Sequence, residues 1–211
     1  MEPPPAETHA ILPLAVLEAM RNLDSPTDEE AAEYVDELLK KRLGLSDTVA
    51  AQIARYDLGV RRGRPVGGAE FEQILRLAGR RPDAALVFAD GGRRAARRAL
   101  AGLSVASRWG ARYLPRLVRR AIGFRAARRC LRSVFAVALV RENGTMMARA
   151  ADRLGVRATP DGAACGFYAA AVTELLRQLT CFDGAVVHAR CCARGDDRCE
   201  WHTSAPPAEA R

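Results

Sequence analysis

The stretch HARCCARGDDRCEW, residues 188–201, constrains the fold of this chain more than any other part, because it places three cysteines and a histidine within fourteen residues. The pattern predicts a β-strand, a turn containing Gly195 and a second short strand. Cys191 and Cys199 flank this turn, so their side chains can project toward one point from opposite strands. His188 lies three residues before Cys191, and in a regular strand that odd spacing places the two side chains on opposite faces. A shared site therefore requires the first strand to bend or bulge.

A third sulfur can reach the same point from the side, because Cys165 begins the helix predicted just before this hairpin. Three thiolates and one imidazole form a closed tetrahedral ligand set, which is typical of structural zinc and leaves no coordination position open for catalysis. The spacing alone leaves a second interpretation open, in which these cysteines are small buried apolar residues. Of the remaining cysteines, we expect Cys192 to face away from the site and Cys130 and Cys181 to pack in the core.

Hydrophobic periodicity predicts helices in the first part of the chain, and helices alternating with two β-hairpins in the second. The dipeptide Asn143-Gly144 marks the turn of the first hairpin. Residues 1–10 are expected to form a loose tail. The predicted helices span residues 25–44, 45–59, 69–79, 83–101, 104–129 (broken at Pro115 and Gly123) and 165–180.

This order of elements predicts an α+β fold, in which helices pack on a small antiparallel sheet and a helical extension precedes them at the amino terminus. The turn-rich segment RRGRPVGG, residues 61–68, is the best candidate for a boundary. We therefore expect a helical amino-terminal region, residues 1–80, and a second domain, residues 81–205.

Charge is distributed unevenly along the chain, whose net charge is +8. Residues 1–40 hold ten acidic residues against Arg21 and Lys40, whereas residues 91–141 hold fourteen arginines and no acid. Such a basic stretch can contact nucleic acid weakly, anionic lipid, or an acidic partner such as residues 1–40 of the same or another chain. The stretch lacks lysines and interleaved aromatic residues, which favours the alternative that it forms solvated helix faces.

The amino-terminal sequence MEPPPAETHA has no basic segment followed by an apolar one, so a secretory signal is not expected. The longest apolar run, residues 134–140, is about a third of the length that a membrane span needs. We expect a cytoplasmic protein without a membrane span, in which cysteines stay reduced or bind metal.

The segment from Cys165 to Trp201 resembles the end of the 4-vinyl reductase domain family, whose members are also described as hydrocarbon-binding domains. The shared pattern is a cysteine that opens a helix, a strand, and then C-x-A-x-G-x-x-x-C-x-aromatic, supplied here by Cys191, Ala193, Gly195, Cys199 and Trp201. The order of elements is similar over residues 82–203, while residues 1–80 have no counterpart in this pattern.

The resemblance implies a zinc site. In the aromatic-sensing domains of sigma-54-dependent activators, which carry a similar module, zinc is held by the helix cysteine, the two hairpin cysteines and a glutamate three residues before the first of these. His188 takes the place of that glutamate here. Because histidine is an equally good zinc ligand, the implied ligand set is Cys165, His188, Cys191 and Cys199.

The resemblance also implies three functions. Family members bind small apolar molecules between helices and sheet, others are similar to scaffold subunits of the vesicle-tethering TRAPP complex, and a further branch acts as a vinyl reductase or its accessory in bacteriochlorophyll synthesis. We therefore expect a zinc-stabilised domain that binds a small hydrophobic molecule as sensor or carrier, with a vinyl reductase and a scaffold or polyanion-binding protein as alternatives. A homodimer is a further expected assembly.

The residues themselves give catalysis little support, since no G-x-G-x-x-G follows a predicted strand and no serine lies in a nucleophile elbow. A reductase built on this chain would take its reducing cofactor from elsewhere. Aromatic and methionine side chains suit an adaptable apolar pocket, although each is also explained by core packing. The candidate pocket residues are Trp109, Tyr113, Phe124, Phe135, Met146, Met147, Phe167 and Tyr168.

Overall fold

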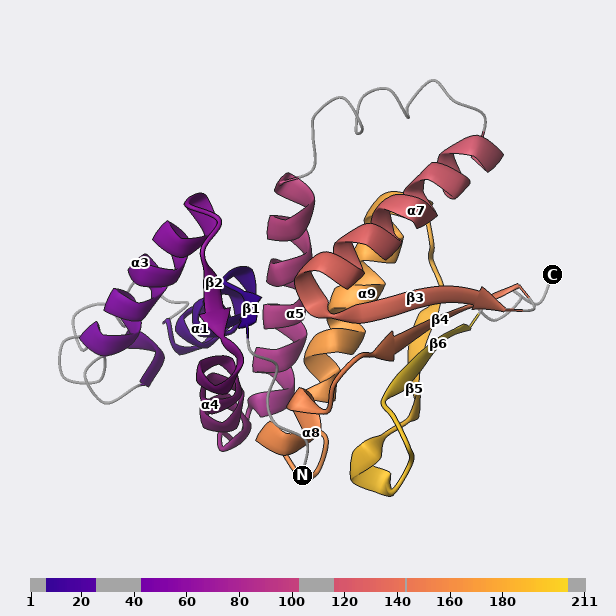
Figure 1. Cartoon of the computed structure of the whole chain (residues 1–211). Helices are drawn as coiled ribbons and strands as arrows, with labels where there is room; N and C mark the ends of the chain where they lie inside the picture. Colours follow the sequence, from indigo (N-terminus) through magenta and orange to yellow (C-terminus); the bar gives the residue numbers. More distant parts are fainter. Residues whose placement is uncertain (1–6, 26–42, 103–115, 143, 205–211) are drawn as a thin grey trace.

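The computed structural model describes residues 7–25, 43–102, 116–142 and 144–204 (Figure 1). The fold is α+β, as predicted: helices pack on one four-stranded antiparallel sheet, and a separate pair of short strands lies near the amino terminus. The elements are β1 (Glu7–His9), α1 (Ile11–Asp24), η2 (Leu43–Leu45), α3 (Asp47–Arg61), β2 (Pro65–Gly67), α4 (Gly68–Gly79), α5 (Ala84–Ala101), α7 (Arg116–Phe135), β3 (Val137–Glu142), β4 (Thr145–Ala150), α8 (Leu154–Ala158), α9 (Cys165–Thr180), β5 (Ala185–Arg190), η4 (Cys192–Arg194) and β6 (Glu200–Ser204).

The four-stranded sheet has the order β3-β4-β6-β5, and every neighbouring pair is antiparallel. Both predicted hairpins are present. Helices α7 and α9 cover one face of the sheet (Figure 1), and the strand residues on that face are apolar and buried. The fully buried ones include Val137, Leu139, Ala148 and Trp201.

Helix α5 runs between α1 and α9, and small residues make this close packing possible. A methyl group on Gly92 would lie 2.2 Å from the carbonyl oxygen of Phe167 in α9. A methyl group on the neighbouring Gly91 would lie 3.4 Å from the Cα atom of Val16 in α1. The inward positions that follow are alanines, and arginines occupy the outward positions of the same helix. The sequence GGRRAARRALA therefore forms a helix segment with small side chains toward α1 and α9 and charged side chains on its outer side.

Helix α1 and strand β1 were not predicted. Residues 7–9 pair with β2, so the expectation of a loose tail over residues 1–10 is wrong for its last part. Ten of the fourteen residues of α1 are buried. Its sequence ILPLAVLEAM is apolar on nearly every side, so it lacks the one-sided period by which a surface helix is recognised, and Pro13 is tolerated because it lies in the first turn.

Two other helix predictions need comment. The predicted helix 45–59 is α3, which begins where Ser46 Oγ accepts a hydrogen bond from the Val49 N–H at 3.3 Å. Helix α7 continues through Gly123 to Phe135, so the expected break at Gly123 is wrong. A methyl group at Gly123 would lie 1.9 Å from the carbonyl oxygen of Leu179, so this glycine allows contact with α9 rather than a bend. Residues 26–42, the body of the first predicted helix, and residues 103–115 lie outside the described residues.

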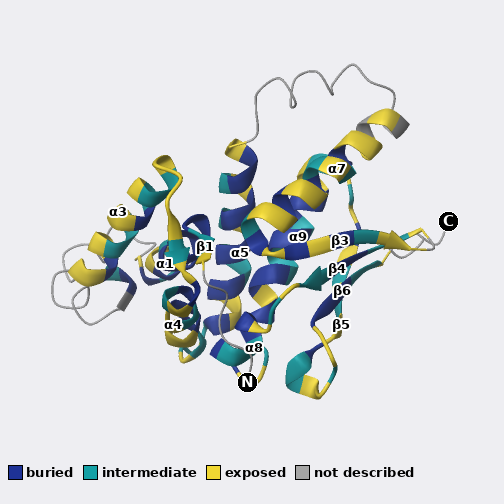
Figure 2. Cartoon of the chain, in the orientation of Figure 1, coloured by how far each residue is buried: buried dark blue, intermediate teal, exposed yellow. Residues whose placement is uncertain are grey.

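Residues from both sides of position 80 contribute to one buried apolar cluster, which includes side chains of α1, α4, α5 and α9. Figure 2 shows buried positions along each of these helices. A buried ion pair also links the two parts: the Arg81 guanidinium donates to both Asp24 carboxylate oxygens, at 2.7 and 2.8 Å. The boundary near residue 80 stays a prediction. Within the described parts of the chain, no helix has the length and apolar content that a bilayer crossing requires.

Candidate metal centre

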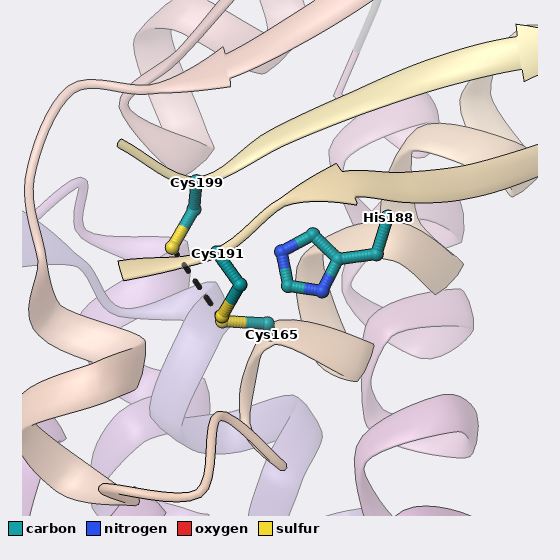
Figure 3. Close-up of side chains that lie close together, drawn as sticks. All are labelled: Cys165, His188, Cys191 and Cys199. Carbon is teal, nitrogen blue, oxygen red and sulfur yellow. Dashed lines mark hydrogen bonds between the residues drawn. The ribbon is translucent and has the colours of Figure 1, made fainter. Parts of the chain in front are cut away.

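Four side chains from the helix and the hairpin converge at one end of the sheet (Figure 3). They are the predicted set Cys165, His188, Cys191 and Cys199, and their nearest ligand atoms all lie within 4.8 Å of one another. Cys165 is the first residue of α9, His188 belongs to β5, and Cys199 precedes β6. The three cysteines are buried and the histidine is half-buried. The group could hold a metal ion, and the predicted convergence is confirmed.

The strand bends where the sequence requires it to bend. The pairing of β5 with β6 is regular as far as His188 and Trp201, and then shifts register between His188 and Arg190. The extra residue in this bulge reverses the alternation of side chains, so Cys191 lies on the same side as His188. The predicted bulge is therefore confirmed.

The turn between the two hairpin cysteines is held by its own hydrogen bonds. The Cys191 N–H donates to the Asp196 carboxylate at 2.7 Å, and the Asp196 N–H donates to the Cys191 carbonyl at 3.2 Å. Gly195 has a φ angle of +90°, a conformation that favours glycine. The acidic residue and the glycine of ARGDD thus close the loop and fix the direction of the Cys191 side chain.

The imidazole of His188 is oriented by Trp201, its direct partner across the two strands. The two rings stack with centroids 5.0 Å apart and an angle of 14° between their planes. Figure 3 shows the imidazole pointing toward the three sulfurs. Its Nε2 atom is buried and has no hydrogen-bond partner among the described residues. A buried polar atom without a partner is costly, and coordination to a metal would satisfy it.

The sulfurs of Cys165 and Cys199 lie 3.8 Å apart, and their ionisation is linked. The hydrogen bond from the Cys165 thiol, together with smaller effects of His188 and Cys192, lowers the pKa of Cys199 to about 4 against the opposing effect of burial. The same hydrogen bond and burial raise the pKa of Cys165. A metal binds the thiolate form of cysteine. The lowered pKa of Cys199 therefore favours the form that a soft cation needs.

The other three cysteines differ in part from expectation. Cys192 lies outside the group of four ligands, but it approaches Cys199 with its backbone N–H and its thiol, so the expectation that it faces away is wrong. Cys130 is buried as predicted, and burial raises its pKa to about 11. Cys181 is exposed, because it caps the end of α9 with a φ angle of +54°, so its assignment to the core is wrong.

The predicted pocket residues do not form one group. Trp109 and Tyr113 lie outside the described residues, while Phe124 and Met146 are partly buried against the core and Met147 and Phe167 are buried in it. Only Phe135 and Tyr168 border the cavity described next.

This cavity, of about 380 Å³, lies between β1, α1, α4, the end of α7 and the start of α8. Its apolar lining includes Leu12, Phe71 and Leu154 in addition to Phe135 and Tyr168. Its polar side is lined by Glu7, Thr8, His9, Arg64, Arg132, Ser133 and Asp152. Sequence reasoning missed the contribution of Leu12 and Phe71, since nothing in the pattern indicates that the amino-terminal helices meet this part of the core.

A continuous series of ring contacts joins the metal centre to this cavity. His188 stacks on Trp201, and each following ring contacts the next with centroids 5.4 to 6.2 Å apart, in the order Trp201, Tyr168, Phe167 and then both Phe71 and Phe135. Tyr168 and Trp201 belong to the two elements that the metal ligands join. The wall of the cavity therefore depends on how α9 sits against the terminal hairpin.

Comparison of the chain with protein-family models, curated proteins and solved structures finds no match.

Proposed function

We propose that this chain is a zinc-stabilised binding domain for a small apolar molecule, acting as a sensor or carrier. The observation that carries the proposal is the series of ring contacts from His188 to the cavity. It makes the metal ligands and the cavity wall parts of one packed unit.

The donor set and its geometry favour zinc. Ligands at the corners of a tetrahedron, with Zn–S bonds of about 2.3 Å, place sulfurs about 3.8 Å apart. The distance between Cys165 Sγ and Cys199 Sγ matches this value. Soft thiolates and a borderline imidazole also suit zinc better than they suit hard cations such as magnesium or calcium. Cys165, His188, Cys191 and Cys199 would hold the ion, and four protein ligands leave no position for a substrate, so the metal is structural.

The cavity suits a small ligand whose apolar body lies against its apolar side. Its volume of about 380 Å³ lies within the range of small-molecule sites. Leu12, Phe71, Phe135, Leu154 and Tyr168 offer an apolar surface built largely of aromatic rings, and such a surface binds flat hydrocarbons by burial and stacking.

The proposal is tested on the purified full-length chain in two steps. Metal analysis should find one zinc per chain. A panel of monocyclic and bicyclic aromatic compounds should then raise the melting temperature of the zinc-loaded protein by mass action, while sugars of similar size should not. Replacing Ser133, which lines the cavity from α7, with tryptophan should abolish this shift, and Arg128→Trp on the same helix outside the cavity should retain it. A folded protein without metal, or a shift that survives Ser133→Trp, would contradict the proposal.

A further inference from the structure

The outer face of α7 carries a single stripe of exposed side chains. Val118, Ile122, Arg125, Arg129 and Arg132 follow one another at spacings of four, three, four and three residues, which places them on one side of a helix. We refer to these five residues as the α7 stripe. All five are exposed, and so is Arg128 at the edge of the stripe. Figure 2 shows that much of α7 is exposed. Helix α7 contains no acidic residue.

The arginines of this stripe lack the ion pairs that most arginines of α5 form. On α5, Arg94, Arg97 and Arg98 form ion pairs with Asp90, Glu174 and Glu18, and so serve the fold. Arg125, Arg129 and Arg132 form no ion pair with any residue that the structure describes. Three unpaired guanidinium groups on one helix face repel one another, so they favour an anionic partner.

Two apolar residues, Val118 and Ile122, form one end of the stripe and distinguish between possible anionic partners. Val118 is 43% exposed and Ile122 is 38% exposed, and these are two of the six large apolar side chains with high exposure in the described parts of the chain. They lie toward the end of α7 that extends away from the sheet (Figure 1). Phosphate groups of a nucleic acid gain nothing from valine and isoleucine, whereas the interface of a bilayer accepts both apolar side chains and the arginines beside them.

We propose that the α7 stripe binds the surface of an anionic lipid bilayer. Arg125, Arg129 and Arg132 contact the lipid phosphates, and Val118 and Ile122 enter the boundary between headgroups and acyl chains. The helix lies on the membrane and does not cross it. Arg132 also borders the cavity, but the residues replaced in the tests, Val118, Ile122, Arg125 and Arg129, do not line it. None of the five belongs to the candidate metal centre, so the inference does not depend on the proposed function.

The test is sedimentation of the full-length, metal-loaded protein with vesicles of phosphatidylcholine containing 30% phosphatidylglycerol, and with vesicles of phosphatidylcholine alone. Binding should require the anionic lipid and should weaken as salt is raised. Replacing both Arg125 and Arg129 with glutamine should weaken binding about 30-fold, since each basic residue near such a surface contributes about a factor of five. The matched control Arg62→Gln/Arg80→Gln, which neutralises two exposed arginines elsewhere, should stay within about twofold of wild type.

A second pair of variants separates lipid from nucleic acid. Val118→Ser/Ile122→Ser should weaken vesicle binding about tenfold while leaving retention on heparin unchanged, because only the bilayer uses the apolar groups. Leu58→Ser/Leu86→Ser, which alters two other exposed apolar residues, should bind vesicles like wild type. Circular dichroism and metal content confirm that each variant is folded. Absence of binding to anionic vesicles at low salt would overturn the proposal. Binding to DNA at least as tight as to vesicles, with no effect of Val118→Ser/Ile122→Ser on vesicle binding, would assign the stripe to nucleic acid instead.

Discussion

The four side chains of the candidate metal centre depend on different local features. Cys165 is placed by the start of a helix, His188 by its partner Trp201, and Cys191 by the bulge and the Asp196 hydrogen bond. Cys199 receives hydrogen bonds from its neighbours, which keep its pKa low. The site is therefore built from several independent constraints, and the loss of one ligand is not compensated by the others.

Replacing Cys199 with serine should remove the metal and destabilise the protein by about 3 kcal/mol, on the scale of losing a structural metal ligand. Cys192→Ser is the matched control, because it keeps the backbone N–H that approaches Cys199 and removes only a thiol outside the four ligands. It should retain one metal ion per chain and cost less than about 1 kcal/mol. Urea unfolding and metal analysis measure both variants, and equal stability of the two would show that no metal is bound through Cys199.

The ion pair between Asp24 and Arg81 makes the stability of the protein sensitive to acid. Burial opposes ionisation of Asp24, but hydrogen bonds from Arg81 and from the Gly44 N–H outweigh it and lower the pKa of this carboxyl. A group whose pKa is lower in the folded state stabilises the fold above its unfolded pKa, which is about 4, and loses this effect as the pH falls through the folded value.

Asp24→Asn should lower the free energy of unfolding by about 2 kcal/mol at pH 7, because it removes one of the two carboxylates, Asp24 and Asp83, that pair with the half-buried Arg81 guanidinium. The difference from wild type should shrink below about pH 4, where the wild-type carboxylate also becomes protonated. Denaturant unfolding at pH 7 and pH 3 measures this, with Asp183→Asn, an exposed residue, as the control that changes little at either pH. A difference that stays constant with pH would contradict the assignment.

At the scale of elements, the position of α5 between α1 and α9 depends on residues without large side chains. The backbone of α9 comes so close to Gly92 that a methyl group there would overlap the Phe167 carbonyl oxygen. Around Gly92 the inward side of α5 therefore contributes close approach rather than side-chain area, whereas the first turns of the same helix bury Val87 and Phe88.

Gly92→Ala should destabilise the protein by about 2 to 3 kcal/mol, although alanine is the better helix former, because the two helices must move apart. Gly166→Ala provides the opposite case. This glycine is exposed in the first turn of α9, where a methyl group would make only an ordinary contact of 3.9 Å with Phe88, so the change should stabilise by up to about 1 kcal/mol. Thermal unfolding of the two variants gives the comparison, and stabilisation by Gly92→Ala would show that α5 and α9 are not in close contact.

For the whole molecule, the proposed metal is expected to stabilise one end rather than the entire fold. The ligands join the start of α9 to the β5–β6 hairpin, whereas α1, α4 and α5 pack through apolar side chains with no part in the metal centre. Loss of the metal should therefore open the hairpin locally before the chain unfolds globally.

Removal of the metal with a chelator should increase amide hydrogen exchange about tenfold or more in β5, β6 and the first turn of α9, because their anchor is lost. Exchange in α1 and α5 should change little. Mass spectrometry of peptides after exchange locates the effect, and adding zinc back should reverse it. Uniform deprotection of all elements would instead indicate that the metal holds the entire core together.

The sequence alone determined the local features of this protein. Periodicity and turn residues predicted both hairpins and four of the described helices, and the odd spacing of His188 and Cys191 predicted the bulge, because these patterns depend on neighbours along the chain. The ligand set also followed from local order, together with a family resemblance over residues 165–201. Helix α1 escaped prediction because a helix buried on nearly all sides has no amphipathic period to reveal it.

Only the tertiary structure decided which distant segments meet. It brought α1 and α4 to the cavity beside Phe135 and Tyr168, turned Cys181 to solvent, and showed that Gly123 makes a contact rather than a kink. It also separated Arg97 and Arg98 of α5, which pair with acids of α9 and α1, from Arg125, Arg129 and Arg132 of α7, which form no ion pair with a described residue. These outcomes depend on contacts between residues far apart in the sequence, and the free energy of such contacts is set by packing in three dimensions, which no local pattern encodes.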